Sequence, residues 1–417
     1  MTLLGHLHKG WIAAMAVLAL SACPALSATF SVKRGVNLDV WTTWPQEAQW
    51  GEPGVLSPYP EWRKFLKAGD LEALAAAGFD FVRMPVDPAP WLSQTSAGLG
   101  DELYASVRES ARMINAAGLK VVVDLHSMPA GGGRSIGTRE LMDDQAAFDR
   151  YVEVVRGMAR TLAQEDPAKV ALEVMNEPTM ACEGADADIW SGRLKRLFAA
   201  ARASATRLTL VLSGSCWSNA EGLAALDPAD FPDDNLMWTF HSYDPFLLTH
   251  QGATWAGDFI QYVTGLPYPL HAVPRAELDA VVGRIKAVID EKAPWSRRSG
   301  MKAYLDELIA GIDTKEKLEA AMEKPFATID AWARRHGVAS ENILLGEFGM
   351  IRQEYQNPHV VPAAERAAYL RDMIGHAERH GYAWSIWGFG GAFGIVQEFE
   401  GRPAEPDVLD VVRGLPR

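Results

Sequence analysis

Hydrophobic and polar positions along the chain form two recurring patterns. Short, continuous apolar runs rich in β-branched residues predict strands covered on both faces, and longer amphipathic segments predict helices. Strands are expected at 34–40, 79–86, 120–126, 170–177, 208–214, 236–243, 343–349 and 383–389. Helices are expected at 70–78, 102–118, 143–164, 186–205, 315–337, 363–381 and 406–415, with a short helical stretch after the fifth strand. Eight alternations of strand and helix predict one (β/α)8 barrel, a TIM barrel in the α/β class.

The connection between the sixth and seventh strands is longer than one barrel helix requires. Its residues from 244 to 274 are irregular and rich in aromatic side chains, and extra helices are expected at 274–292 and 301–312. A loop that follows a barrel strand emerges on the catalytic face. We therefore expect the insertion, about 244–313, to form a wall or lid there. The alternative is a helical hairpin with no part in the site.

The first 28 residues have the pattern of an export signal. Lys9 precedes a ten-residue apolar run, which is too short to span a bilayer, and small residues follow. The stretch 25–28 fits cleavage by signal peptidase, whereas 20–23 fits a lipoprotein signal that would leave Cys23 lipidated. We expect a single catalytic domain over 29–417, exported to the periplasm or the medium. Membrane attachment is expected only through lipid at Cys23.

Composition narrows the classes of partner. The formal net charge of −13 disfavours nucleic acid and anionic membrane surfaces and suits a neutral or soluble partner. The chain is expected to be a monomer. The 14 tryptophans fit either a large core or a cleft in which indole rings stack on sugars. Cys182 and Cys216 follow the fourth and fifth strands, where an oxidising compartment would favour a disulfide between them. The alternative is that both are small core residues.

Polar residues gather where the predicted strands end, although unpaired polar groups are costly to bury. They are Arg83, Asp124, His126, Asn176, Glu177, His241, Tyr243, Glu347 and Trp387. In a barrel these ends converge, and Glu177 and Glu347 on opposite strands can face each other at roughly 5 Å, the separation used in retaining glycoside hydrolysis. Strand alternation places Glu173 and Glu177 on one face and Asn176 on the other. We therefore expect a bulge or a twisted strand end here, with Glu173 pointing into the barrel toward a polar partner.

The order of these motifs resembles glycoside hydrolase family 5, the cellulase-like retaining (β/α)8 glycosidases. The resemblance runs from "RGVNLDVW" through "NEP" and "GEFG" to "WSIWGFGG". It implies that Glu177 is the acid/base and Glu347 the nucleophile, with Arg83 and Tyr243 keeping Glu347 ionised and oriented. It also implies that Asn176 binds the sugar 2-hydroxyl, that His126 and His241 bond the substrate and the acid/base region, and that Trp387 floors the subsite of the attacked sugar.

The expected substrate is an oligo- or polysaccharide, most simply a soluble β-glucan. Trp41, Trp44, Trp91, Trp217 and Trp255 are candidate stacking residues of the subsites. An exo-glycosidase or a transglycosylase using the same glutamates is one alternative, and a non-catalytic carbohydrate-binding barrel is another. No cofactor is expected. A metal site at Asp124, His126 and His241 is the weaker alternative, because the chain has no HExxH motif or cysteine cluster.

Overall fold

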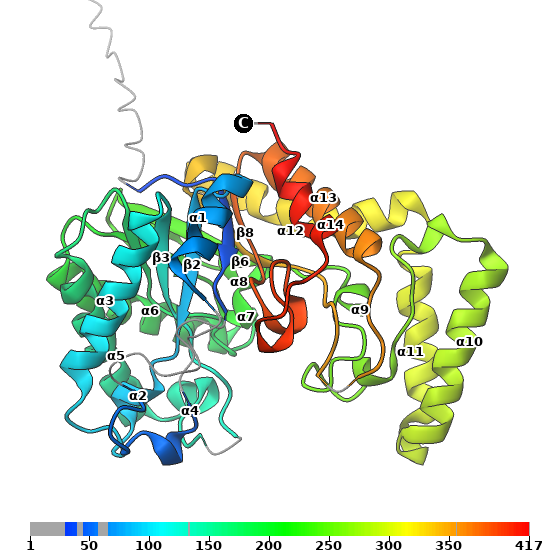
Figure 1. The fold of residues 1–417 in the computed structure, drawn as a ribbon, viewed down its shortest axis with the longest axis horizontal. Helices are drawn as coiled ribbons and strands as arrows, with labels where there is room; N and C mark the ends of the chain where they lie inside the picture. The colour runs from blue at the N-terminus through cyan, green and yellow to red at the C-terminus, as the bar shows by residue number, and fades with distance from the viewer. Residues whose placement is uncertain (1–29, 40–44, 57–65, 132–133, 356, 417) are drawn as a thin grey trace, which may run out of the picture.

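The eight predicted strands close into one parallel barrel in the order β1 to β8 (Figure 1). The computed structural model describes residues 30–39, 45–56, 66–131, 134–355 and 357–416. The strands are β1 Arg34–Asn37, β2 Phe81–Val86, β3 Lys120–Leu125, β4 Val170–Glu173, β5 Thr209–Ser213, β6 Leu236–His241, β7 Ile343–Phe348 and β8 Ala383–Ile386. The predicted (β/α)8 fold is confirmed. Residues 1–28 with Cys23, and both Trp41 and Trp44, lie outside the described residues.

Helices surround the barrel, which explains why its strands are apolar on both faces. Those of the outer ring are α1 Ala68–Ala77, α3 Gly100–Ala116, α5 Gln145–Leu162, α6 Ala185–Ser204, α8 Ala220–Ala224, α12 Lys315–His336, α13 Ala363–His380 and α14 Pro406–Arg413. Two short helices, α2 Ala89–Leu92 and α4 Thr138–Asp143, lie in the loops after β2 and β3. All six residues of β2, β6 and β7 are buried.

An apolar plug fills the end of the barrel where the strands begin. One side chain from each of seven strands packs there with Phe30 and Val32. Gly35 is required at this level, because a Cβ atom on it would lie 2.4 Å from the Phe81 ring. The plug closes one end of the barrel, so polar side chains can converge only at the other end, where the strands finish.

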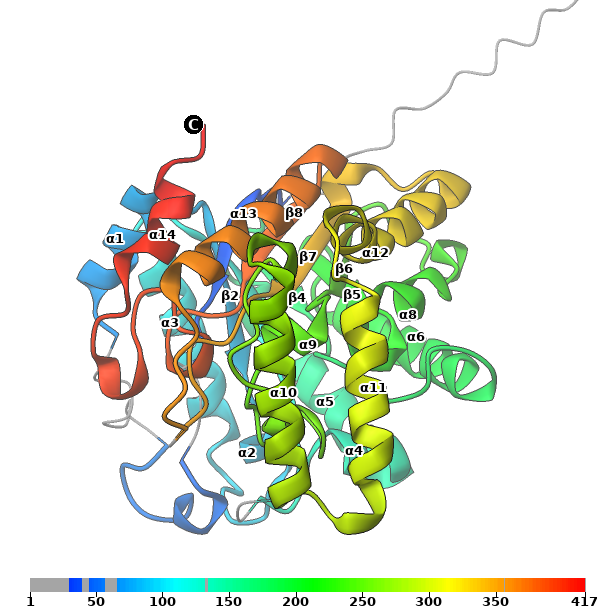
Figure 2. The same ribbon diagram turned by 90° about the vertical axis from the view of Figure 1, so that its right-hand side faces the viewer.

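The insertion between β6 and β7 forms a helical hairpin beside the barrel (Figure 2). The chain passes through α9 Phe246–Thr249 and an irregular segment before α10 Arg275–Lys292, a short turn of 3-10 helix at Trp295–Arg297, and α11 Arg298–Ala310. Both views place the α10–α11 turn on the side of the barrel that carries α2 and α4. The hairpin therefore runs beside the barrel, with its turn toward the end where the strands finish.

Predicted strands run longer than observed ones mainly at their C-terminal ends. The strand expected at 170–177 stops at Glu173, and the one expected at 236–243 stops at His241. The polar residues at these ends leave the backbone ladder and turn their side chains toward the barrel mouth. Within the described ranges, no helix is long and apolar enough to cross a membrane.

Candidate active site

The strand-end residues predicted from the sequence meet at one end of the barrel. They come from β2 (Arg83), the loop after β3 (His126), the segment after β4 (Asn176, Glu177), β6 and its loop (His241, Tyr243), β7 (Glu347) and the residue after β8 (Trp387). Hydrogen bonds, ion pairs and a ring contact join all eight into one network. The convergence follows from topology, since parallel strands all end at the same face.

Arg83 lies at the centre of this network and is completely buried. Its partners are Asn37, Asp124, Glu173, Asn176 and Glu347. Nη1 donates to Glu347 Oε1 at 2.7 Å and to Asn37 Oδ1 at 3.0 Å. Nη2 donates to Asn176 Oδ1 at 2.7 Å. A guanidinium has five N–H donors in a rigid fork, and here all of its nitrogens are engaged. Arg83 therefore cannot move without breaking contacts with several strands.

Glu173 is the inward-pointing carboxylate expected from strand alternation, and the structure confirms its position. It has no exposed surface. Its two oxygens accept from Arg83 Nε and Nη2, each at 2.8 Å, in a two-point pair. Burial raises the pKa of Glu173, and the neighbouring guanidinium opposes that rise. The polar partner predicted for Glu173 is thus the same arginine that holds Glu347.

Glu347 is buried, and both of its oxygens have strong donors. Oε1 accepts from Arg83, and Oε2 accepts from the Tyr243 hydroxyl at 2.9 Å. Burial raises the pKa of Tyr243 well above its usual range, so the phenol stays protonated and remains a donor. Glu347 thus accepts one charge-assisted hydrogen bond and one from a phenol, which fix the direction of both oxygens.

Glu177 has different surroundings. Its Oε1 lies 2.9 Å from His241 Nδ1, and 29% of its side chain is exposed. Burial raises the pKa of Glu177 to about 7. Burial also lowers the pKa of His241 to about 4, so the imidazole is neutral and puts no positive charge beside Glu177 at neutral pH. A carboxyl group in such a place keeps its proton to a higher pH than a carboxyl group in water.

The end of β4 is irregular, as expected, and this irregularity aims Glu177. The backbone ladder ends at Glu173, and Glu177 has a φ of 40°, in the left-handed region. A non-glycine residue in that region costs about 1–3 kcal/mol and is found mostly at functional sites. The conformation breaks the strict alternation, so Asn176 and Glu177 both join the network. Register shifts occur elsewhere, in the β6–β7 and β7–β8 pairs.

The two carboxylates lie close together across the barrel mouth. One oxygen of Glu177, one oxygen of Glu347 and one nitrogen of His241 are all within 4.8 Å of one another. That spacing is close to the separation typical of retaining glycosidases and shorter than that of inverting ones. Within the described part of the chain, these three also form the one acid–histidine group compact enough to hold a metal ion. Asp124 and His126 do not belong to that group.

Asn176 is fixed from two sides. Its Oδ1 accepts from Arg83, and its Nδ2 lies 3.1 Å from His126 Nε2. The other ring nitrogen of His126 is 2.8 Å from Asp124, and the ring stacks on Trp387 with centroids 5.4 Å apart. Burial raises the pKa of Asp124 to about 7 and lowers that of His126. This side of the site is a rigid, uncharged surface of an amide, an imidazole and an indole.

Sequence reasoning missed two polar residues at the end of β1. The Asn37 amide donates to Gly346 O and Ser385 Oγ, each at 3.0 Å, which ties β1 to β7 and β8. Asp39 accepts from Gly390 N at 3.1 Å, and burial raises its pKa to about 7. The strand-end rule applied to "RGVNLDV" would have found both residues, because they follow the same pattern as the other strands.

The candidate subsite tryptophans differ in exposure. Trp217 is 56% exposed and Trp255 is 59% exposed. Trp91 is half-buried: its ring lies 5.0 Å from that of Tyr104, and its N–H donates to Gly100 O. Trp217 and Trp255 thus present free ring surface beside the site, whereas Trp91 is largely engaged in packing.

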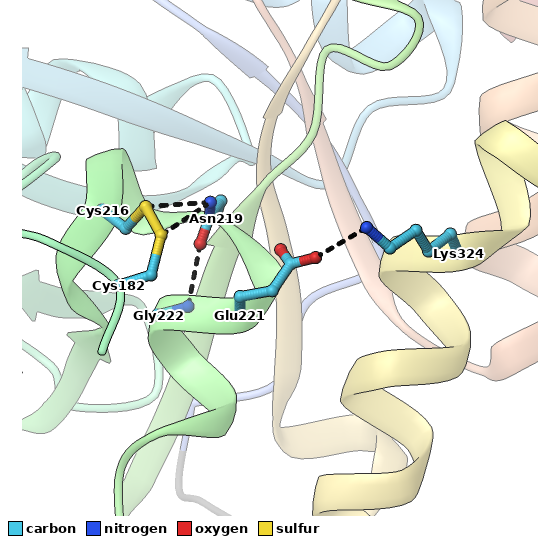
Figure 3. The surroundings of a disulfide bond; sticks show 6 residues. All are labelled: Cys182, Cys216, Asn219, Glu221, Gly222 and Lys324. Atoms are coloured by element: carbon cyan, nitrogen blue, oxygen red, sulfur yellow. Dashed lines mark hydrogen bonds and ion pairs between the residues drawn. A yellow bond between two sulfur atoms is a disulfide. The ribbon is translucent and has the colours of Figure 1, made fainter. Parts of the chain in front are cut away.

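A disulfide joins the loops after β4 and β5 (Figure 3). It links Cys182 to Cys216, and Asn219, the N-cap of α8, contacts Cys216 Sγ at 3.1 Å. Cys216 and Trp217 both have positive φ, and their amides donate to Met180 O at 2.8 Å and to Pro178 O at 3.0 Å. The bond and these hydrogen bonds hold the Trp217 turn against the segment that carries Glu177.

Two carboxylates at this separation across the mouth of a (β/α)8 barrel define a site of the glycoside-hydrolase type. Residues 54–392 match the family described as cellulase (glycosyl hydrolase family 5), and the chain belongs to that family. Endoglucanase C of Acetivibrio thermocellus is 26% identical over 245 residues, which are 57% of this chain and 65% of that protein. Endoglucanase 3 of Fibrobacter succinogenes is 23% identical over 351 residues, 80% of this chain and 47% of that protein. The match thus spans less than two thirds of either relative.

Solved structures share the fold. The cellulose synthase subunit Z from Clostridioides difficile superposes with a TM-score of 0.63 at 18% identity, over 91% of this chain and 99% of that one. Endoglucanase Cel5A of Thermotoga maritima, solved in complex with cellobiose, has a TM-score of 0.62 at 19% identity, over 91% of this chain and 97% of that one. At these sequence identities, the likeness shows a shared (β/α)8 fold.

Proposed function

We propose that the chain is a retaining glycoside hydrolase that cleaves β-linked glucan or a related polysaccharide by double displacement. Glu347 is the nucleophile and Glu177 the acid/base. The observation that carries this proposal is the contrast between two carboxyl groups within 4.8 Å of each other. One is held by a guanidinium and a phenol, and the other has a pKa raised to about 7 by burial. Retaining hydrolysis requires such a division between an ionised nucleophile and a protonated acid.

The reaction follows from these environments. In the first step Glu347 attacks the anomeric carbon, the glycosidic bond breaks, and Glu177 gives its proton to the departing oxygen. The glycosyl ester leaves Glu347 neutral and Glu177 ionised. In the second step Glu177 takes a proton from water, the water oxygen attacks the same carbon, and Glu347 is released. Arg83 and Tyr243 stabilise the Glu347 carboxylate as it leaves, because both donate to its oxygens.

The surrounding residues have supporting roles in the same proposal. Asn176, fixed by Arg83 and His126, presents its amide to the sugar 2-hydroxyl. Trp387, stacked on His126, is the apolar floor under the attacked sugar. Trp217 and Trp255 offer exposed rings for other units of the same polysaccharide. The endoglucanase names of the relatives support glucan as the substrate class.

Substitution of each glutamate tests the roles separately. Glu347→Gln should lower kcat on a soluble glucan by roughly 10³-fold or more, as expected when a reacting group is lost. Glu177→Ala should also be slow on the glucan, because the departing oxygen receives no proton. On a dinitrophenyl cellobioside, whose leaving group needs no acid, azide should speed turnover of Glu177→Ala and yield a glycosyl azide with the β configuration, since azide needs no general base. Glu319→Gln, an exposed substitution on α12, is the matched control. Normal hydrolysis by Glu347→Gln would overturn the assignment.

A glycan panel identifies the substrate and the mode of action. Reducing ends and product masses from β-1,4-glucan, β-1,3-glucan and mannan should show which linkage is cut and whether internal bonds are cleaved. Proton NMR of the first product should show the β anomer. Products longer than the substrate would identify a transglycosylase, and binding without turnover would identify a carbohydrate-binding barrel.

Export is part of the proposal and rests on the pattern of the first 28 residues. The mass of the mature protein should show cleavage near residue 28 or a lipidated Cys23. A mature protein that retains Met1 and the apolar run would contradict export.

A further inference from the structure

The insertion between β6 and β7 exposes more aromatic surface than any other segment of the described chain. Large hydrophobic side chains with high exposure include Phe246, Trp255, Trp295 and Tyr304, all within it. Trp295 is the extreme, at 84% exposed. Single exposed hydrophobic residues are ordinary on protein surfaces, but several on one element indicate a binding surface.

Trp295 is not required by the hairpin's own core. The two helices pack through apolar side chains such as Ile285, Ile289 and Leu305, which are buried. Lys286–Asp306 and Lys302–Asp290 ion pairs, at 2.6 and 2.7 Å, join the helices on their surface. These contacts hold the hairpin together without Trp295, and the exposed indole lies at its turn.

The turn also lies on the catalytic side of the barrel. Figures 1 and 2 show the α10–α11 connection at the level of α2 and α4, which occupy loops after strand ends. An ion pair between Arg297 and Asp258 ties the turn to the irregular segment that contains Trp255. The Phe259 and Tyr304 rings, 5.2 Å apart, join the same segment to α11.

A chain of ring contacts leads from that segment to the carboxylates. Trp255 lies 5.3 Å from His250, and His250 lies 4.9 Å from Tyr243, measured between ring centroids. Tyr243 donates to Glu347. The segment that carries Trp255 is therefore anchored to the site through His250, which is itself buried, and the exposed rings lie farther out on the insertion.

We propose that Trp255 and Trp295 form a distal glycan-binding site, which holds a part of the polysaccharide several units away from the bond being cut. This inference rests on the proposed function and names its substrate as a long, neutral β-linked chain. Indole rings offer flat apolar faces that match the C–H faces of pyranoses. Arg297 at the turn is paired with Asp258, which offsets one positive charge close to the indole.

The test compares Trp295→Ala with Trp295→Phe and with Ile189→Ala, which removes an exposed apolar side chain outside the insertion. KM is measured on a long soluble β-glucan and on a short aryl cellobioside. Trp295→Ala should raise the ratio of polymer KM to short-substrate KM roughly three- to tenfold, the effect of one lost aromatic contact. Trp295→Phe should restore part of that loss, and Ile189→Ala should leave the ratio unchanged. An unchanged ratio in Trp295→Ala would overturn the inference.

Direct binding separates failure of this inference from failure of the proposed function. Each substitution is combined with Glu347→Gln, and mobility is measured in gels containing the same β-glucan. Retardation that weakens with Trp295→Ala supports the distal site even if no glucan in the panel is cleaved. Retardation that does not depend on Trp295 overturns it. Light scattering gives a further outcome: loss of self-association in Trp295→Ala would mean that the turn contacts a second copy, which also overturns the glycan site.

Discussion

Replacing Glu173 by glutamine changes one buried charge and almost nothing of the side chain's shape. Glu173 is fully buried and pairs with Arg83 at two points. Its negative charge is one of the influences that raise the pKa of Glu177, whereas His126 and Arg83 lower it. His241, at 2.9 Å, is neutral at working pH, and Glu347 faces Glu177 across the mouth. Glutamine removes the charge and leaves more of the guanidinium's charge uncompensated, and both changes favour ionisation of Glu177.

The smallest expected effect follows from the length of the chain between the two residues. Four residues of extended chain span at most about 13 Å, which is an upper limit on the backbone separation of Glu173 and Glu177, because β4 ends at Glu173. At an effective dielectric constant of about 20, two unit charges at that distance interact by about 1.3 kcal/mol, which corresponds to about one pKa unit. A protonated Glu177 is required for the first step, so kcat/KM falls as pH rises through its pKa, about 7. Glu173→Gln should move this alkaline limb toward pH 6.

The assay is kcat/KM against pH for the glucan that the panel identifies, with wild type and variant at one ionic strength. Circular dichroism checks folding, since breaking a buried pair can cost about 3–5 kcal/mol of stability. Asp124→Asn serves as a control, because burial gives the Asp124 carboxyl a pKa of about 7 as well. A folded, active Glu173→Gln enzyme with an unshifted alkaline limb would refute the reasoning. If the alkaline fall of kcat/KM is absent in Asp124→Asn, that fall reports the titration of Asp124 and not of Glu177.

Two further changes test other parts of the site. Tyr243→Phe removes one of the donors to Glu347. It should lower kcat roughly 10- to 100-fold, because a hydrogen bond to a charged group contributes about 1.5–3 kcal/mol. Single-turnover kinetics should locate the loss in the chemical steps, and an unchanged rate would contradict the role of the phenol. The double change Cys182→Ser and Cys216→Ser opens a link across 34 residues, and urea unfolding should show a loss of about 2–4 kcal/mol. An unchanged midpoint, with the disulfide demonstrated in the wild type, would mean that hydrogen bonds alone hold the Trp217 turn.

The barrel was predictable because its strands differ from its helices in period and length. Short β-branched runs such as 121–123, between amphipathic helices, favour strands covered on both faces, and the polar residues that follow them mark the mouth. Both extra helices of the insertion were predicted at nearly their observed positions, at 275–292 and 298–310. The position of Glu173 followed from strand alternation alone.

Other features depend on contacts that sequence patterns do not contain. The left-handed φ of Glu177 is unusual for a glutamate, so no propensity would predict it. Trp91 follows a predicted strand, as Trp217 does, and its contacts with Tyr104 and Gly100 in the folded chain make it a packing residue. Trp295 lies between two predicted helices, and its position on the catalytic side depends on how the hairpin packs against the barrel.

The contacts of Arg83 imply that enzymatic activity depends on closure of the whole barrel. Its partners come from β1, β3, β4 and β7 or from segments beside them, which are far apart in the sequence. An incomplete barrel that lacks the β7 and β8 region could already pair this guanidinium with Asp124 and Glu173, but it would not yet hold Glu347. The last strands to pair would therefore bring the reacting carboxylate to a cation that is already in place. Recovery of activity during refolding should then report closure of the eight-stranded barrel. A fragment without β7 and β8 could be compact and helical and still have no activity.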